Sequence, residues 1–215
     1  MISYKHNLIF VHIPKTGGTS IEDIIWPSKK DRTEKNLWMG YVRPYYNKYQ
    51  TGGMQHLLAT QIRQEVGAKM FDQCFKFTIV RNPWDKVISQ FMYIKKRQDV
   101  LDFIGMEKDD CLKTYLSLIQ KCTYVQSECQ YKFFLDENGE QLVDYIGRFE
   151  NFTEEVKTIL KKKKLDRTLF GLRERKIPHK MKSQRKPYQD YFDDESAQMV
   201  QHIYSKDIEL LNYQF

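Results

Sequence analysis

The sequence predicts an α/β fold in which a mostly parallel sheet is flanked by helices. Residues 8–13 and 75–80 are apolar and rich in β-branched or aromatic side chains, as buried strands are. Each is followed directly by turn residues and then by apolar residues at helical spacing, and residues 145–150 are interpreted as a third strand. Repeated strand–turn–helix units favour a parallel sheet with helices on both faces.

The chain has 215 residues, which suits a single domain spanning 1–215 and suffices to bury a sizeable core. No internal repeat, low-complexity tract or linker divides it. Its 13 Phe, 14 Tyr and 3 Trp residues argue against a disordered segment. The formal net charge of +7 favours anionic ligands, such as a phosphorylated nucleotide, an acidic glycan, nucleic acid or an anionic membrane, without separating them.

Cysteine spacing and hydropathy indicate where in the cell the protein is expected. The cysteines at positions 74, 111, 122 and 129 lack the paired spacing of a zinc site, so we expect free thiols and no metal. The first residues lack the charged-then-apolar pattern of a signal peptide, and no apolar run approaches the length of a membrane span. We therefore expect a soluble cytoplasmic protein with no integral membrane segment.

Residues 8–20, LIFVHIPKTGGTS, form the segment around which the rest of the chain is organised. Pro14 ends the strand, and apolar residues from Ile21 onward follow at helical spacing. The free N–H groups of the first helical turn and the helix dipole would both face the intervening turn, which makes it an anion site. Its predicted donors are Lys15, Thr16, Gly17, Gly18, Thr19 and Ser20.

The order of lysine and glycines separates this loop from the usual nucleotide P-loop, GxxxxGK[ST], in which lysine follows the glycines. Lys15 instead precedes Gly17 and Gly18, which argues against an ordinary ATPase or GTPase. The segment HIPKTGGTSI resembles the 5′-phosphosulfate loop of the sulfotransferases that use 3′-phosphoadenosine-5′-phosphosulfate (PAPS). Among these it is similar to the carbohydrate-type enzymes of sulfotransferase family 2 and to bacterial forms. The resemblance implies a P-loop-like nucleotide-binding core in which Lys15 stabilises charge on the bridging oxygen as adenosine 3′,5′-bisphosphate leaves.

Arg81 comes directly after the second predicted strand, and Ser89 lies on the helix predicted to follow. Asn82 is suited to cap that helix, and Pro83 to occupy its first position. Ligands of open α/β sheets collect at the carboxyl ends of strands, and the fork of Arg81 suits a terminal phosphate. The segment IVRNPWDKVISQF resembles the 3′-phosphate motif of the same family, an arginine followed eight residues later by a serine. The resemblance implies that Arg81 and Ser89 hold the 3′-phosphate.

His56 follows Gly52-Gly53 and precedes a predicted helix over residues 57–66, which Gly67 ends. By itself, a histidine in this place is usually structural or merely exposed. In the resembled family, a histidine just ahead of such a helix is a candidate base for the acceptor hydroxyl, which assigns that role to His56. His12 is the rival, although its position inside the first strand favours burial beneath the loop.

The C-terminal part of the chain resembles the same family. A basic tract there is similar to the loop that lies over the nucleotide, which implies cofactor contacts from Ser183, Arg185 and Lys186. Residues 193–195 begin a predicted final helix.

Two further segments carry weaker signals. The segment RFENF, residues 148–152, resembles a structural marker of the family, and Asn151 with Glu154 is typical of a capping box at the start of a helix. Residues 95–139 contain one predicted helix, around Leu112, Leu116 and Ile119, and no chemistry that the sequence identifies.

These observations predict a sulfotransferase that moves a sulfuryl group from PAPS to a hydroxyl acceptor, with a carbohydrate as the favoured acceptor, a histidine base and no nucleic-acid partner. A P-loop kinase or NTPase is the first alternative, but it needs a magnesium-holding acidic residue after a strand, where this chain has Arg81. A non-enzymatic binder of acidic glycan or nucleic acid is the second, and it leaves the Lys15 loop unexplained. Because eukaryotic glycan sulfotransferases are usually anchored Golgi proteins, the Golgi lumen is the alternative compartment.

Overall fold

A computed structural model describes residues 1–38, 40, 53–167, 177 and 185–215. Within these residues, strands form one sheet in the order β1-β2-β3-β4, in which β2, β3 and β4 are parallel and β1 is antiparallel to β2. The strands are β1 (Ile2–Ser3), β2 (Leu8–Val11), β3 (Phe75–Val80) and β4 (Tyr145–Arg148). The α/β fold predicted from the sequence is confirmed.

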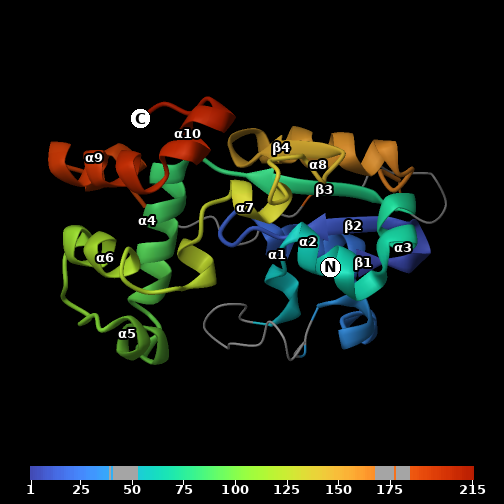
Figure 1. Cartoon of the computed structure of the whole chain (residues 1–215), viewed down its shortest axis with the longest axis horizontal. Coiled ribbons are helices and arrows are strands. Elements are labelled where there is room, and N and C mark those ends of the chain that lie inside the picture. Colours follow the sequence, from blue (N-terminus) through green and yellow to red (C-terminus); the bar gives the residue numbers. More distant parts are fainter. Residues whose placement is uncertain (39, 41–52, 168–176, 178–184) are drawn as a thin grey trace.

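Helices cover the sheet and extend beyond the carboxyl ends of its strands, where α4, α5, α6 and α9 gather (Figure 1). The helices are α1 (Gly18–Ile25), α2 (Ala59–Val66), α3 (Ala68–Gln73), α4 (Pro83–Ile94), α5 (Gln98–Ile104), α6 (Leu112–Ile119), α7 (Tyr131–Phe134), α8 (Phe152–Lys162), α9 (Asp194–Ile203) and α10 (Ser205–Leu211). Only two residues separate the end of β3 from the start of α4, so the first turn of α4 lies at the edge of the sheet where ligands collect.

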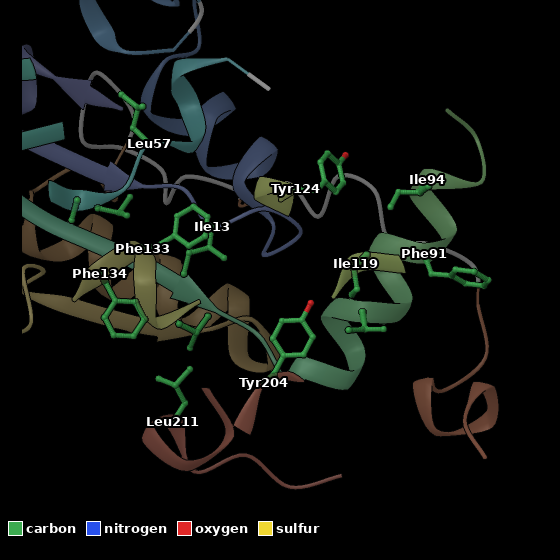
Figure 2. Packing of buried hydrophobic residues seen from close by; sticks show 14 of the residues in the cluster. Ile13, Leu57, Phe91, Ile94, Ile119, Tyr124, Phe133, Phe134, Tyr204 and Leu211 are labelled. Atoms are coloured by element: carbon green, nitrogen blue, oxygen red, sulfur yellow. The ribbon is translucent and has the colours of Figure 1, made fainter. Parts of the chain in front are cut away.

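The two faces of the sheet pack into separate hydrophobic cores because successive strand residues point to opposite sides. Phe10 and Phe77 lie on one face, stack on each other, and pack with α1 and α8. Ile9 and Val11 lie on the other face with α2, α4, α7 and the C-terminal helices. This second core is continuous from Leu57, near the sheet, to side chains on α4 and α6 (Figure 2).

The predicted elements match the structure where local sequence signals set them. The second strand occupies residues 75–80 as predicted, and the oxygen of the Asn82 side chain accepts hydrogen bonds from the N–H groups of Trp84 and Asp85 at 3.0 and 3.4 Å. Pro83 is the first residue of α4, and Gly67 follows the end of α2. These signals act over four residues or fewer, which is why the sequence alone reveals them.

Several boundaries differ from the prediction. The strands predicted over residues 8–13 and 145–150 end earlier, at Val11 and Arg148, the latter because Phe149–Asn151 form a 3₁₀ turn. The helix after His56 begins at Ala59, because His56 belongs to a short 3₁₀ turn, Met54–His56. Asn151 does not cap α8 with its side chain, because the chain enters that helix through a 3₁₀ turn instead of the extended conformation typical of a cap.

The predicted final helix is divided into α9 and α10 at Tyr204, whose backbone leaves the helical region at φ −111° and ψ 25°. Its hydroxyl donates a hydrogen bond of 2.7 Å to the carbonyl of Ser127.

The aromatic loop after Pro27 lies partly outside the described residues, since 39 and 41–52 are not among them. None of the helices described is both long enough and apolar enough to span a membrane.

Candidate functional site

The Lys15 loop joins the carboxyl end of β2 to the first turn of α1. Lys15 and Gly17 both have positive φ angles, 66° and 88°, and this left-handed backbone is unfavourable for a lysine. The Thr16 hydroxyl, fully buried, donates a hydrogen bond of 2.8 Å to the carbonyl of Ile13. That hydroxyl therefore holds the shape of the loop, and its proton is not directed towards a ligand.

The ammonium group of Lys15 lies 4.2 Å from the centre of the Tyr93 ring on α4, a cation–π contact. Burial, together with repulsion by Arg81 and Lys96, lowers the pKa of Lys15 to about 8. A cation in such surroundings gains from any anion that binds beside it. The surroundings of Lys15 therefore favour the binding of an anion beside its ammonium group.

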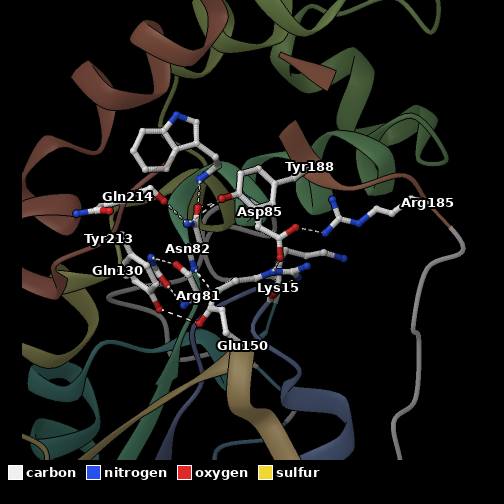
Figure 3. A network of polar contacts seen from close by, with 11 residues as sticks. Lys15, Arg81, Asn82, Asp85, Gln130, Glu150, Arg185, Tyr188, Tyr213 and Gln214 are labelled. Atoms are coloured by element: carbon white, nitrogen blue, oxygen red, sulfur yellow. Dashed lines mark hydrogen bonds and ion pairs between the residues drawn. The ribbon is translucent and has the colours of Figure 1, made fainter. Parts of the chain in front are cut away.

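Arg81 follows β3 directly and is 6% exposed. Its Nε donates to Asp85 Oδ2 at 2.7 Å, and its Nη1 donates to the backbone carbonyl of Lys15 at 2.8 Å. The guanidinium carbon lies 4.0 Å from the centre of the Phe149 ring. The Lys15 carbonyl contact ties the two predicted phosphate motifs to each other directly (Figure 3).

Asp85 bridges two arginines that are far apart in the sequence. One carboxylate oxygen accepts from Arg81, and the other forms an ion pair with Nη2 of Arg185 (Figure 3). The second terminal nitrogen of Arg185, Nη1, is buried and has no hydrogen-bond partner among the described residues. A buried guanidinium nitrogen without a partner is costly unless a ligand supplies the acceptor.

Two phenylalanines from the β4–α8 connection form the floor of the loop. A Cβ atom added to Gly17 would lie 2.7 Å from Phe152 and 3.1 Å from Phe149, so the backbone there approaches these rings more closely than any side chain allows. Phe149 also stacks beneath Arg81. The RFENF segment therefore supports both motifs at once.

The two histidines of the site lie in contact, with ring centres 4.4 Å apart. His12 is enclosed: its Nδ1 lies 3.2 Å from a carboxylate oxygen of Glu22, and its Nε2 lies against Gly18, where a Cβ would be only 1.8 Å away. Nδ1 of His56 lies 3.0 Å from the backbone carbonyl of His12. Because a carbonyl only accepts, Nδ1 of His56 carries the proton and Nε2 is left with its lone pair.

The remaining predicted residues are placed as follows. Ser89 is half-buried and lies on the α4 face that carries Asp85 and Tyr93, since residues four apart share a helix face. Within the loop, Thr19 is exposed and Ser20 is buried. Lys186 is exposed, and Ser183 lies outside the described residues.

Sequence reasoning missed Asp85, Phe149 and Gln130 as members of the site. Phe149 lies within the RFENF marker, so the sequence does single out this segment. It does not indicate that the Phe149 ring packs against Arg81. Asp85 lies in the first turn of α4, where an acidic residue suits the helix dipole, and nothing local in the sequence shows that it meets Arg185. Gln130, whose side-chain amide hydrogen-bonds both the N–H and the carbonyl of Arg81, lies in a segment with no recognisable motif. In the described part of the chain, no group of three His, Cys, Asp or Glu side chains is arranged to hold a metal ion.

An open groove of about 650 Å³ lies apart from these residues, between α2, α7 and the chain around residue 137. Its lining includes Arg63, Tyr131 and Lys206 but none of the predicted site residues. This groove is therefore separate from the candidate site at the edge of the sheet.

Comparison with known proteins finds a family whose model covers nearly the whole chain. The model of the sulfotransferase family matches residues 1–214. A protein of Archaeoglobus fulgidus, described only as uncharacterized, is 33% identical over 106 residues, which are 48% of this chain and 79% of that protein. No solved structure matches the chain significantly.

Proposed function

The chain belongs to the sulfotransferase family, and we propose that it transfers a sulfuryl group from PAPS to a hydroxyl acceptor, with a carbohydrate as the favoured class. Sulfate transfer follows from membership of the family. The donor, the acceptor and the roles of individual residues are the proposal.

One observation supports the choice of donor above the others. Lys15, Arg81 and Arg185, three cations from distant parts of the sequence, converge beyond the carboxyl ends of β2 and β3 through the contacts of Arg81 and Asp85. Nη1 of Arg185 is buried there without a partner. Several cations gathered in one place suit a nucleotide that carries more than one anionic group, as PAPS does at its 5′ and 3′ positions.

In the proposed reaction, the acceptor oxygen forms a bond to sulfur as the bond between sulfur and the 5′-phosphate oxygen breaks. The acceptor proton passes to Nε2 of His56, and the products are a sulfate ester and adenosine 3′,5′-bisphosphate. Lys15 and the N–H groups of the loop stabilise charge on the departing oxygen. Arg81 and Ser89, with Arg185 beside them, bind the 3′-phosphate, and Lys186 lies next to Arg185 in the sequence.

The state of His56 fits a proton acceptor. Burial, followed by repulsion from His12, lowers the pKa of His56 to about 3, so its ring is neutral at physiological pH. The carbonyl of His12 fixes the proton on Nδ1 and leaves Nε2 as the acceptor. An anionic donor bound nearby would raise the pKa of His56 towards the value that an efficient base needs.

Ligand-dependent thermal unfolding tests the donor class. At about a hundred times its Kd, a ligand stabilises a protein by about 2.7 kcal/mol, which corresponds to a rise of roughly 5–11 °C in Tm for a chain of this size. We expect adenosine 3′,5′-bisphosphate to give such a rise at concentrations at which AMP, ATP with Mg²⁺ and heparin give much less. A larger rise with ATP and Mg²⁺ would favour the kinase alternative, and one with heparin alone would favour a glycan binder.

The acceptor is tested separately, with labelled PAPS and a panel of glycans and small alcohols. Transfer of label to glycans is the expected result. Transfer to small alcohols alone would overturn the carbohydrate assignment and leave the donor assignment intact.

A further inference from the structure

Gln130 holds both backbone hydrogen-bonding groups of Arg81. Its side-chain oxygen accepts from the N–H of Arg81 at 2.8 Å, and its side-chain nitrogen donates to the carbonyl of Arg81 at 2.8 Å. Gln130 is fully buried and lies at the start of α7, in the segment where the sequence shows no chemistry. Figure 3 shows its amide against the backbone of Arg81.

Gln130 is itself fixed in place by α10. One carboxylate oxygen of Asp207, a fully buried residue, accepts from the N–H of Gln130 at 2.7 Å, and the other accepts from the N–H of Tyr131 at 2.8 Å. The Asp207 carboxylate therefore orients the first turn of α7, and with it the side chain of Gln130.

Side chains from α4 and from Tyr204 hold the chain just before Gln130. The ammonium group of Lys86, 2% exposed, donates to the carbonyls of Gln126 and Glu128 at 3.2 and 3.1 Å. Gln90 donates to the side chain of Gln126 at 2.9 Å. Segment 126–130 is thus attached to the helix that follows Arg81 and is not a free loop.

The placement matters because Arg81 lies where the β-ladder has ended. On its far side, the N–H of Asn82 donates to Glu150 at 2.6 Å. Side chains therefore fix the peptide groups on both sides of Arg81, and the direction of its guanidinium is set before any ligand binds. Such preorganisation reduces the cost of binding.

We propose that Gln130 is a positioning residue that aims the guanidinium of Arg81, and that it thereby sets the preference of this enzyme for a nucleotide with a 3′-phosphate. This inference rests on the proposed function, in which Arg81 meets that phosphate. It also gives segment 95–139 a role in donor recognition.

The test is the ratio of the affinities for adenosine 3′,5′-bisphosphate and AMP, measured by calorimetry on the full chain. Gln130→Met keeps the length of the side chain and removes both hydrogen bonds to Arg81. It should lower the ratio roughly tenfold to a hundredfold, because a misplacement of about 1 Å can cost on the order of a hundredfold. AMP affinity should change less than the affinity for the bisphosphate, because the Thr16 hydroxyl holds the Lys15 loop through Ile13 without the help of Arg81. Gln130→Leu, which is also apolar, of similar volume and without hydrogen bonds to Arg81, is the second variant should Gln130→Met fail to fold, and it should shift the ratio in the same direction.

Gln90→Met is the matched control, because Gln90 is also a buried glutamine that contacts the same segment but does not touch Arg81. Its ratio should stay within about twofold of the wild type, because Gln90 makes its hydrogen bond to Gln126 and not to Arg81. If Gln130→Met or Gln130→Leu keeps the wild-type ratio, Gln130 has only a structural role and the inference is wrong. Equal affinities of the wild type for the two nucleotides would instead overturn the proposed function itself.

Discussion

The ionisation of Lys15 links the candidate site to pH. Burial lowers its pKa to about 8, so the free protein loses this charge within an accessible pH range. An anionic nucleotide binds the protonated amine more tightly and therefore raises the pKa of Lys15 in the complex. The affinity for the nucleotide is therefore highest at pH values well below 8, where Lys15 is protonated, and it falls as the pH rises above 8.

We therefore predict that the affinity for adenosine 3′,5′-bisphosphate falls roughly tenfold between pH 8 and pH 9.5, the loss expected from one titrating amine. Calorimetry across this range measures it. Lys15→Met should bind more weakly and show little dependence on pH over the same interval. The same slope in both proteins would mean that another group titrates.

Mutation can distinguish the roles of the two histidines, because His12 is packed between Glu22 and Gly18. His56→Ala should lower kcat by roughly a hundredfold to ten-thousandfold, the usual contribution of a positioned base. The affinity for adenosine 3′,5′-bisphosphate should be nearly unchanged, because His56 is assigned to the acceptor. Steady-state kinetics and calorimetry test both statements. Near-normal turnover in His56→Ala, with loss of turnover but normal nucleotide binding in His12→Ala, would transfer the role to His12.

At the scale of single elements, the first turn of α4 is joined to distant parts of the chain through Asn82. Its side-chain oxygen caps the helix, and its side-chain nitrogen donates to the backbone carbonyl of Gln214 at 2.8 Å. The N-cap of α8 differs, because Asn151 stands at that position without a capping hydrogen bond from its side chain.

Asn82→Ala should lower the free energy of unfolding by about 1–2 kcal/mol, the range for a lost cap, and lower the Tm by about 2–4 °C per kcal/mol. Asn151→Ala is the control, and its Tm should stay close to that of the wild type. Thermal unfolding of both variants decides the matter. Equal losses of stability in Asn82→Ala and Asn151→Ala would show that the capping hydrogen bonds of Asn82 add nothing to the stability of the protein.

The contrast between Asn82 and Asn151 illustrates which features can be predicted from the sequence. The strand at residues 75–80, the cap at Asn82 and the loop at Lys15 were predictable because their signals are local. The pairing of Arg185 with Asp85 and of Gln130 with Arg81 was not, since each joins residues far apart in the chain by contacts that leave no local pattern. Local signals also misled, because a 3₁₀ turn overrides the capping pattern of Asn151.

At the scale of the whole molecule, the end of the chain returns to the beginning of α4. The Phe215 ring lies 5.5, 6.0 and 5.7 Å from the ring centres of Trp84, Tyr188 and Phe192. Phe215 is nevertheless 51% exposed, much like Leu210 at 49%. The two side chains thus differ in their neighbours more than in their burial.

Phe215→Ala should therefore cost about 1–2 kcal/mol, because aromatic pairs contribute about 0.5–1.5 kcal/mol beyond the area that they bury. Leu210→Ala, equally exposed, should change the stability by less than about 0.5 kcal/mol, as surface substitutions usually do. Chemical denaturation measures both. A loss in Leu210→Ala as large as that in Phe215→Ala would refute a specific aromatic contribution.

The parallel pairing of β2 with β3 has a consequence for how the protein refolds. Leu8 pairs with Phe75, so the chain between them must be gathered before these strands meet. Because closing such long loops precedes any gain from the contacts, domains built on distant pairings fold slowly for their size. Lys15 follows β2 and Arg81 follows β3, so these two cations come together only after the two strands have paired. After dilution from denaturant, nucleotide binding should therefore recover with the sheet and lag behind the helical circular dichroism signal.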